Sequence, residues 1–422
     1  MVLSSTSVAS SVSKKYKNEE EVREKEASIE KPTWQHSHNI TDKIFSTRLG
    51  QCQQTGQQRI AESFVEGLRP CGSRKILEPR SGEPVGYGLP YQMLNMKANR
   101  DQNTLLCLWS LKDDRARRIQ LLHVESFVRS HRKRRHKIEI NIRQGDTVIV
   151  QECYQITGLA WTPHLLTVYD HCDYIIYTTS PFMGNADSLA VFRCLDCTDP
   201  RIFHCEDFKL GKNTTWCCGW NRHAKQFGVG SDGKVIMGDV DTRETWELPV
   251  DNSSVLSLVF SHQGSSILYS GTRQGHVFTH DSRTPLHRCE NRLTHPSGIT
   301  CLHLMTDENY LLASDLTGEI RLWDVRQRAT VQRYEGNYNE NKLLPFHVDP
   351  SETVLCAAGQ DCYTRLWSLR TSRLLCTLPP PHPASRSHIP TLCYFSPMGS
   401  VAAKGCPGLL LGMLDELHYY SL

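Results

Sequence analysis

The chain has 422 residues and a formal net charge of +3, so bulk charge gives no support to a nucleic-acid binder. It has no apolar run long enough to cross a membrane as a helix, and its Ser-rich start lacks the charged and apolar regions of a secretion signal. We therefore expect an intracellular protein, nuclear, cytoplasmic or both, in which most of the 17 cysteines are reduced. The glycosylation triplets at Asn39, Asn213 and Asn252 are then chance matches.

The first part of the chain is polar. Residues 1–45 contain a charge-dense run at residues 14–31 and few apolar side chains, which predicts a disordered charged tail with a transient helix over residues 19–30. Residues 46–95 are predicted to be a linker with a short helix at residues 58–68 (QRIAESFVEGL), followed by a Pro/Gly-rich stretch.

From residue 96 to residue 422 the pattern changes. Short runs rich in Val, Ile, Leu, Phe and Trp, such as DYIIYTT and SILYSG, are separated by clusters of Gly, Asp, Asn, Ser and Pro. No long helical periodicity is present. This pattern predicts an all-β domain over residues 96–422 with frequent turns.

The β region also repeats. KVIMGDVDT, HVFTHDSRT, EIRLWDVRQ and YTRLWSLRT align with one another and begin at Lys234, His276, Glu319 and Tyr363, which are 42, 43 and 44 residues apart. A period of about 40–45 residues with a Trp-Asp strand end is typical of WD-repeat β-propellers. The length allows seven or eight blades, and we expect seven. We expect the segments near residue 105 and at the C-terminus to meet and close the ring, which removes exposed sheet edges.

Trp323 and Trp367 mark the repeat, because each offers a large apolar plate and one N–H donor at a strand end. In well-formed repeats that donor joins a buried network with Ser or Thr, Asp and His. Asp361 stands at the expected position six residues before Trp367, but Thr317 occupies that position before Trp323, and His280 replaces a Trp. The blades are therefore divergent, and we expect packing to carry more of the stability.

Arginine follows the strand end in three successive repeats, within Asp281-Ser282-Arg283, Asp324-Val325-Arg326 and Ser368-Leu369-Arg370. The repeat places these turns on the same circular face. A protein-docking rim is one hypothesis, because the planar guanidinium makes bidentate bonds and is weakly hydrated. The alternative is that each arginine is a solvated turn residue that neutralises its neighbouring Asp.

Trp-Asp-x-Arg endings on adjacent blades resemble the box in substrate receptors of cullin-4 ubiquitin ligases, which bind the adaptor damage-specific DNA-binding protein 1. The segments NYLLASDLTGEIRLWDVRQ, VQRYEGNYNENKLLPFHVDP, AAGQDCYTRLWSLR and LLCTLPPPHPASRSHIP further resemble the fourth group of the adaptor-and-cullin-4-associated factors. The resemblance implies a non-catalytic receptor that reaches cullin-4 through the adaptor and holds a protein target for ubiquitination.

The same resemblance assigns the box positions to Asp281, Arg283, Asp324 and Arg326. Arg326 fits best, because His280 stands where Trp is expected before Asp281, and Ser368 replaces Asp before Arg370. The family also implies a docking helix N-terminal to the propeller, for which residues 58–68 are the candidate. A generic WD-repeat scaffold in another complex remains the main alternative.

The basic run RSHRKRRHK at residues 129–137 has three interpretations: a solvated loop between strands, a nuclear-localisation signal, or a nucleic-acid contact. The last would make the chain a nucleic-acid-associated propeller. Nucleic-acid binding is the least favoured, because no aromatic residues are interleaved for base stacking.

Metal, cofactor and enzyme readings find little support. The closely spaced cysteines are poorly arranged for zinc, because adjacent strand residues point to opposite faces; they are Cys194, Cys197, Cys205, Cys217 and Cys218. No P-loop, G-x-S-x-G or H-E-x-x-H motif is present. We expect no metal, no cofactor, no catalysis, no small-molecule substrate and no membrane partner.

Overall fold

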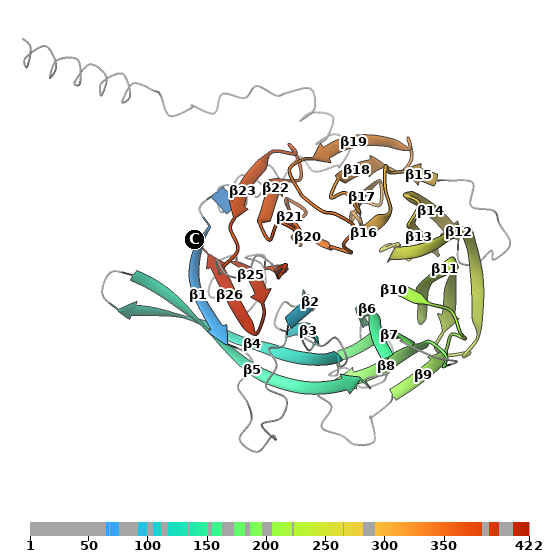
Figure 1. Cartoon of the computed structure of the whole chain (residues 1–422), viewed down its shortest axis with the longest axis horizontal. Coiled ribbons are helices and arrows are strands. Elements are labelled where there is room, and N and C mark those ends of the chain that lie inside the picture. The colour runs from blue at the N-terminus through green and yellow to red at the C-terminus, as the bar shows by residue number, and fades with distance from the viewer. Residues whose placement is uncertain are drawn as a thin grey trace, which may run out of the picture. The chain divides into compact units, whose positions relative to one another are not determined.

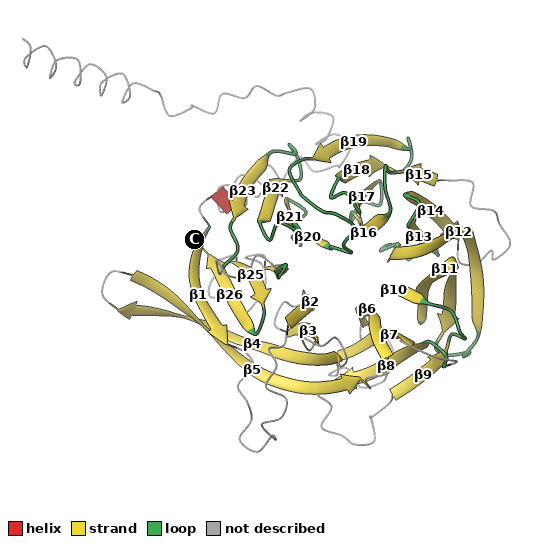
Figure 2. Cartoon of the chain, viewed as in Figure 1, coloured by secondary structure: helices red, strands yellow, loops and turns green. Residues whose placement is uncertain are grey.

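The computed structural model describes residues 65–66, 68–75, 92–98, 104–110, 117–132, 135–150, 154–162, 173–181, 186–195, 205–221, 223–264, 266–281, 292–381, 388–395 and 408–421. The chain divides into two units, residues 1–50 and 51–422, and all described residues belong to the second. The predicted tail at residues 1–45 and its helix lie outside the described residues. Strands dominate the described part (Figure 2), which confirms the all-β prediction.

Two four-stranded antiparallel sheets come first in the ring. The first consists of β2 (Gln92–Ala98), β3 (Thr104–Ser110), β4 (Arg117–Arg132) and β5 (Arg135–Val150). The second consists of β6 (Tyr154–Thr162), β7 (Asp173–Pro181), β8 (Leu189–Leu195) and β9 (Cys205–Lys209).

The next sheet is the largest and has six strands in the order of the chain. It consists of β10 (Thr215–Trp220), β11 (Gln226–Asp239), β12 (Thr245–Phe260), β13 (Ile267–Thr272), β14 (His276–Asp281) and β15 (Arg292–Thr294).

Three four-stranded sheets complete the ring. The first consists of β16 (Ile299–Leu304), β17 (Tyr310–Asp315), β18 (Ile320–Asp324) and β19 (Ala329–Tyr334). The second consists of β20 (Phe346–Val348), β21 (Val354–Ala358), β22 (Thr364–Ser368) and β23 (Leu374–Leu378). The last consists of β24 (Thr391–Phe395), β25 (Gly408–Met413), β26 (Glu416–Ser421) and β1 (Arg69–Lys75).

The described strands form six sheets, so the prediction of seven separate blades is wrong as a count of sheets. The reason lies in two long strands of the largest sheet. β11 bends back on itself at Gly233 (φ 72°), and Val240 N donates to Lys225 O at 2.8 Å. β12 pairs with β11 up to Ser254 and with β13 from Val255 onward, so this one long strand joins two sets of strands into a single sheet.

The prediction of which strand closes the ring was also wrong. β1 pairs with the last strand, from Arg69 opposite Ser421 to Lys75 opposite Glu416 (Figure 1). The expected partner near residue 105 is instead β3, inside the first sheet. β1 and most of β2 precede residue 96, the predicted start of the β domain.

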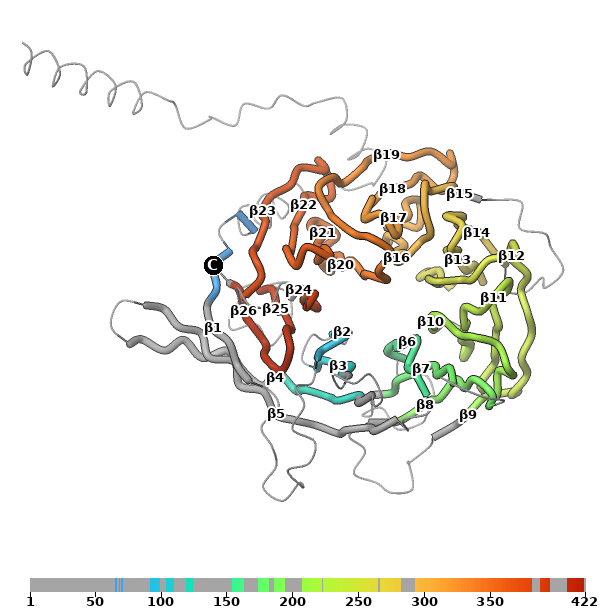
Figure 3. The backbone as a smooth tube through the Cα atoms, viewed as in Figure 1, coloured from blue at the N-terminus to red at the C-terminus, as the bar shows by residue number. Residues whose placement is uncertain are grey.

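Neighbouring sheets pack face to face through buried apolar side chains. Cluster members come from consecutive sheets, as with Leu106 and Ile175, Phe192 and Phe227, or Tyr269 and Leu311. The chain therefore visits the sheets in sequence order around the ring (Figure 3). Every residue of β17 and β21 is buried, because these inner strands have a sheet on each side. The edge strands β19 and β23 are more exposed.

Because successive strands are antiparallel, their connections alternate between the two faces of the ring. The β16–β17 and β18–β19 turns meet on one face, where Val325 N donates to Asn309 O at 3.0 Å. The β17–β18 turn and the β19–β20 loop meet on the other, where Asn341 N donates to Leu316 O at 3.0 Å. We call these the rim face and the loop face.

Candidate docking rim and the polar networks around it

The turn after β18 presents Arg326 to solvent. β18 ends at Asp324, whose buried carboxylate Oδ1 accepts backbone N–H bonds from Arg326 and Gln327, both at 2.9 Å. Arg326 Nε lies 3.9 Å from the same oxygen, and the arginine side chain is 59% exposed. An ion pair this long and exposed contributes little to stability. Asp324 therefore fixes the turn and leaves the guanidinium accessible.

The neighbouring β16–β17 turn lies against this arginine. Burial raises the pKa of the Asp307 carboxyl, and the nearby Arg326 charge opposes that rise. Val325 N is bonded to Asn309 O, so both turns share one surface. The rim near Arg326 therefore carries a cation beside a partly buried acid.

The turn after β22 holds Arg370 on the same face. Two side chains of β19, the strand that follows the Arg326 turn, reach it: Gln332 Nε2 donates to Arg370 O at 2.6 Å, and Tyr334 Oη donates to Leu369 O at 2.8 Å. Arg370 itself is half-buried. The structure thus links the two turns across the sheet boundary.

The third predicted rim position is seen in part. Asp281 ends β14, pairs with Ile267 across the sheet and is half-buried, while Arg283 lies outside the described residues. His280, in the place of a Trp, is buried and hydrogen-bonded to Ser270 Oγ through Nε2 at 2.7 Å. Burial lowers the pKa of His280 to about 4, so the ring is neutral at neutral pH.

Two glutamates tie the rim turns of successive sheets together. Glu308 Oε1 accepts bonds from Ser261 Oγ at 2.6 Å and Gln263 N at 2.8 Å in the preceding sheet. Glu352 Oε1 repeats the contact one sheet further on, accepting Thr306 N and Oγ1 at 2.7 Å each. Sequence reasoning missed these residues. Their spacing equals one repeat, a signal that could have identified them.

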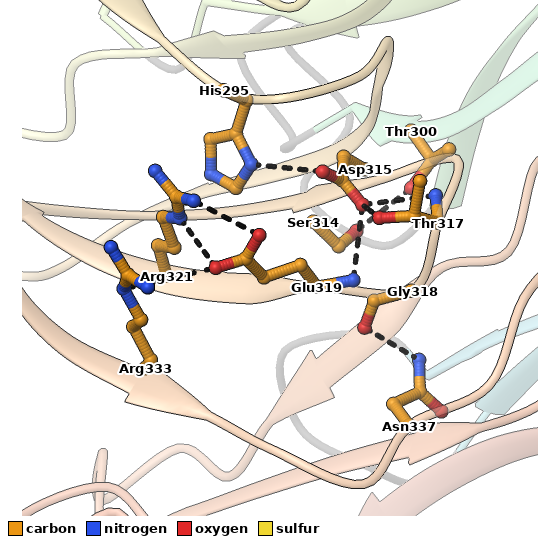
Figure 4. Close-up of polar contacts among 10 residues, drawn as sticks. All are labelled: His295, Thr300, Ser314, Asp315, Thr317, Gly318, Glu319, Arg321, Arg333 and Asn337. Atoms are coloured by element: carbon orange, nitrogen blue, oxygen red, sulfur yellow. Dashed lines mark hydrogen bonds and ion pairs between the residues drawn. The ribbon is translucent and has the colours of Figure 1, made fainter.

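On the loop face a buried network forms around Asp315, at the end of β17 (Figure 4). His295 Nδ1 lies 3.3 Å from Asp315 Oδ2, and both side chains are fully buried. Asp315 Oδ1 also accepts bonds from Thr317 Oγ1 at 2.7 Å and Glu319 N at 3.0 Å. The acid of this repeat is therefore Asp315, two residues before the expected position, and the sequence analysis missed both it and His295.

The tryptophans use their N–H groups differently. Among the described residues no acceptor meets Trp323 Nε1, and His295 stacks at a tilt on that ring with centroids 5.7 Å apart. Trp367 is fully buried, and its Nε1 donates to Glu335 O at 2.9 Å. Asp361 bonds Arg365 through both carboxylate oxygens, at 3.0 and 2.5 Å. The expected Asp–Trp network is thus replaced by a local ion pair.

A second ion pair lies next to the Asp315 network. Arg321 makes two bonds to Glu319, at 2.8 and 2.9 Å (Figure 4). Arg333 Nε stands 3.8 Å from the same carboxylate and is 59% exposed. Arg333 therefore matches Arg326 in exposure and in ion-pair length.

Part of the candidate docking helix is described. Residues 65–66 are helical, and Val65 and Leu68 are buried against the last two sheets, beside Leu378 and Tyr420. Glu66 forms an ion pair with Arg373, the residue before β23. Residues 58–64 and 67 lie outside the described residues.

The remaining sequence motifs are placed as follows. The run at residues 129–137 spans the end of the β4–β5 hairpin, where Arg132 pairs with Arg135, so it is strand on both sides rather than only a loop. Cys217 and Cys218 are free thiols, and burial raises the pKa of Cys218 to about 11. The described residues contain no His, Cys, Asp and Glu cluster able to hold a metal. No helix in the described part of the chain could span a membrane.

The ring of antiparallel sheets, with aligned strand ends one repeat apart and the Trp-Asp end of β18, defines a WD-repeat β-propeller. Residues 189–422 match the family model described as the DDB1- and CUL4-associated factor 4 beta-propeller domain, and the chain belongs to this family.

Curated relatives agree with this assignment. The chain is 39% identical over 217 residues to human DDB1- and CUL4-associated factor 4, covering 49% of this chain and 42% of the relative. It is 37% identical over 217 residues to human DDB1- and CUL4-associated factor 4-like protein 2, covering 49% and 53%. A Bos taurus factor 4 is 35% identical over 217 residues, covering 49% and 42%. The matched region spans about half the length of these relatives.

Proposed function

We propose that the chain is a non-catalytic substrate receptor of a cullin-4 RING ubiquitin ligase. It docks on the adaptor damage-specific DNA-binding protein 1, reaches cullin-4 through it, and presents a protein target for ubiquitination. The supporting observation is the rim turn in which buried Asp324 fixes the backbone and leaves Arg326 59% exposed. The printed names of the relatives state association with the adaptor and the cullin.

The chemistry of the rim supports docking to a protein surface. Arg326 offers a planar donor fork on a turn that is already ordered by Asp324 and by the Asn309 contact, so little backbone entropy is lost on binding. Arg370 lies on the next turn, coupled to β19 by Gln332. Two neighbouring arginines on one ordered face form a compact contact for an acidic patch.

The receptor acts by positioning, since holding a target lysine near the conjugating enzyme raises its effective concentration. In this proposal Asp281 and Arg283 provide a third rim contact, and residues 58–68 a second docking element. Nuclear and cytoplasmic locations both suit such a receptor. The identity of the target is set by surfaces other than the rim.

The test is quantitative pulldown of the purified adaptor by the full chain, as wild type, Arg326→Ala and Arg333→Ala. Arg333 is the matched control, because its exposure equals that of Arg326 and its ion pair is 3.8 Å against 3.9 Å. We expect Arg326→Ala to weaken adaptor binding about tenfold or more and Arg333→Ala to change it less than about twofold.

Arg326→Ala/Arg370→Ala should weaken binding further. Undiminished recovery of the adaptor by the double variant, with unchanged unfolding curves, would contradict the receptor proposal and favour a generic WD-repeat scaffold. Binding to nucleic acid that depends steeply on salt, and that is lost only on deletion of residues 129–137, would instead favour a nucleic-acid-associated propeller.

A further inference from the structure

Exposed large apolar side chains gather at one place on the loop face. In the described part of the chain five such side chains are exposed, and three of them are Tyr338 (45%), Leu343 (48%) and Tyr363 (37%). Tyr338 and Leu343 lie in the β19–β20 loop, residues 335–345, and Tyr363 lies in the β21–β22 turn, residues 359–363. We call these three side chains the tyrosine patch. Clustered exposed apolar groups mark an interaction surface far better than scattered ones.

The loop and the turn that carry the patch are joined by hydrogen bonds. Gln360 N donates to Tyr338 O at 2.7 Å, and Glu340 N donates to Gln360 Oε1 at 2.7 Å. The loop that carries Tyr338 is therefore joined directly to the turn that carries Tyr363 in the following sheet.

The loop is held in shape although it contains no regular secondary structure. The buried side chain of Asn339 donates to Lys342 O at 2.8 Å and accepts from Lys342 N at 3.1 Å. Asn341 takes a left-handed conformation (φ 64°), and its N–H donates to Leu316 O at 3.0 Å. On the other side Asn337 Nδ2 approaches Gly318 O at 3.4 Å (Figure 4). A partner would therefore meet a pre-organised surface, which lowers the entropy cost of binding.

The charged side chains in and beside the loop and the turn that carry the patch have a net charge of −1. Residues 335–345 contain the exposed acids Glu335 and Glu340 and one exposed base, Lys342. Asp361 and Arg365 neutralise each other through two bonds, and Arg365 lies over the Tyr363 ring, 5.8 Å from its centroid. The Tyr338 hydroxyl donates to Glu340, which places a carboxylate at the edge of this aromatic ring.

An aromatic ring beside a carboxylate is suited to a cationic side chain, because the ring face and the acid both attract positive charge. Leu343 adds an apolar contact for a neighbouring side chain. We propose that the tyrosine patch docks an extended protein segment in which Lys or Arg stands next to apolar residues. The proposal rests on the receptor function and assigns the patch to recognition of the target.

The location of the patch supports this role. The β19–β20 loop and the β21–β22 turn lie on the loop face, whereas the turns of Arg326 and Arg370 lie on the rim face. An adaptor bound at the rim therefore leaves the patch uncovered, so both contacts can form together.

The test uses the full chain and short synthetic peptides with one shared apolar core, flanked by Lys and Arg, by Ser, or by Glu. Binding is measured by fluorescence anisotropy. We expect the basic peptide to bind more tightly than the Ser peptide and the acidic peptide least. We expect Tyr338→Ala and Glu340→Gln each to lower the affinity for the basic peptide about three- to thirtyfold.

Leu374→Ala is the matched control, because Leu374 is 44% exposed but stands on the edge strand β23. It should leave peptide affinity unchanged. Tyr363→Ala provides a second patch variant, and urea unfolding of every variant shows that the fold is retained. The proposal would be overturned if peptide affinity did not depend on the charge of the flanks, or if it were unchanged in both Tyr338→Ala and Tyr363→Ala. It would also be overturned if the wild-type chain formed a dimer that dissociates on Tyr338→Ala, because the patch would then bind a second copy of the chain.

Failure of this inference is distinguishable from failure of the receptor function. Arg326→Ala should weaken adaptor binding and leave peptide binding unchanged. Tyr338→Ala should weaken peptide binding and leave adaptor binding unchanged. If peptide binding follows the prediction but adaptor binding ignores Arg326, the patch is a docking site in a different assembly.

Discussion

The sheets β16–β19 and β20–β23 are neighbours with nearly the same sequence pattern, yet they satisfy their polar groups in different ways. The first buries the Asp315–His295 pair and caps its rim turn with Asp324. The second places its acid, Asp361, in a half-buried ion pair with Arg365. The apolar strand faces and the Trp plates are common to both. Packing therefore defines the blade, and the polar contacts can be exchanged between repeats.

The difference extends to the rim. Asp324 accepts two charge-assisted bonds of 2.9 Å from its turn, whereas the neutral Ser368 Oγ accepts a longer bond, of 3.3 Å, from Thr371 N. Arg326 is exposed on the first turn, and Arg370 is half-buried on the second. The turn capped by Asp324 therefore leaves Arg326 exposed to solvent, while the turn after β22 leaves Arg370 half-buried.

The largest expected effect concerns the repeat in which His280 replaces Trp. Because burial lowers the pKa of His280 from 6.5 to about 4, the unfolded chain binds more protons than the folded chain between these values. Stability from this residue is complete above pH 6.5 and falls as the pH drops toward 4. The loss amounts to about 3 kcal/mol.

The measurement is the free energy of unfolding in urea at a series of pH values, for wild type and His280→Asn. The variant should lack this part of the acid dependence. Parallel curves for the two proteins would show that His280 is not buried as a neutral ring in solution.

The next effect separates the two rim turns. Asp324→Ala removes a buried acceptor of two backbone N–H groups and should lower the free energy of unfolding by about 2 kcal/mol, whereas Ser368→Ala should cost about 0.5–1 kcal/mol. Urea unfolding of both variants tests the order. Equal losses would mean that the turns are capped alike. Asp324→Ala should also reduce adaptor binding, because Arg326 loses its fixed turn.

The smallest effect separates the two tryptophans. Trp367 Nε1 donates to Glu335 O, but among the described residues Trp323 Nε1 meets no acceptor. Trp367→Phe should therefore be about 1 kcal/mol more destabilising than Trp323→Phe, since it alone breaks a buried hydrogen bond. Thermal and urea unfolding of the pair provide the comparison, and a larger loss at Trp323 would reverse the interpretation.

Sequence pattern determined what depends on local periodicity. Alternating apolar runs and turn residues predicted an all-β ring, and the spacing of 42 to 44 residues placed Trp323 and Trp367 at the ends of β18 and β22. The same spacing predicted Arg326 and Arg370 on equivalent turns, because a repeat places equal positions on equal turns. Arg326 and Arg370 indeed lie on turns of one face.

Tertiary structure decided what depends on distant partners. The closing strand RPCGSRK has no apolar alternation, and its partner β26 lies at the other end of the chain, so only the assembled ring selects it. Asp315 was not predictable from the repeat offset, because its role depends on His295 from the preceding connection. The tyrosine patch arises because a loop and a turn from different repeats meet on one face. Local periodicity fixes which residues are buried, whereas contacts across sheet boundaries fix which polar and apolar groups remain for a partner.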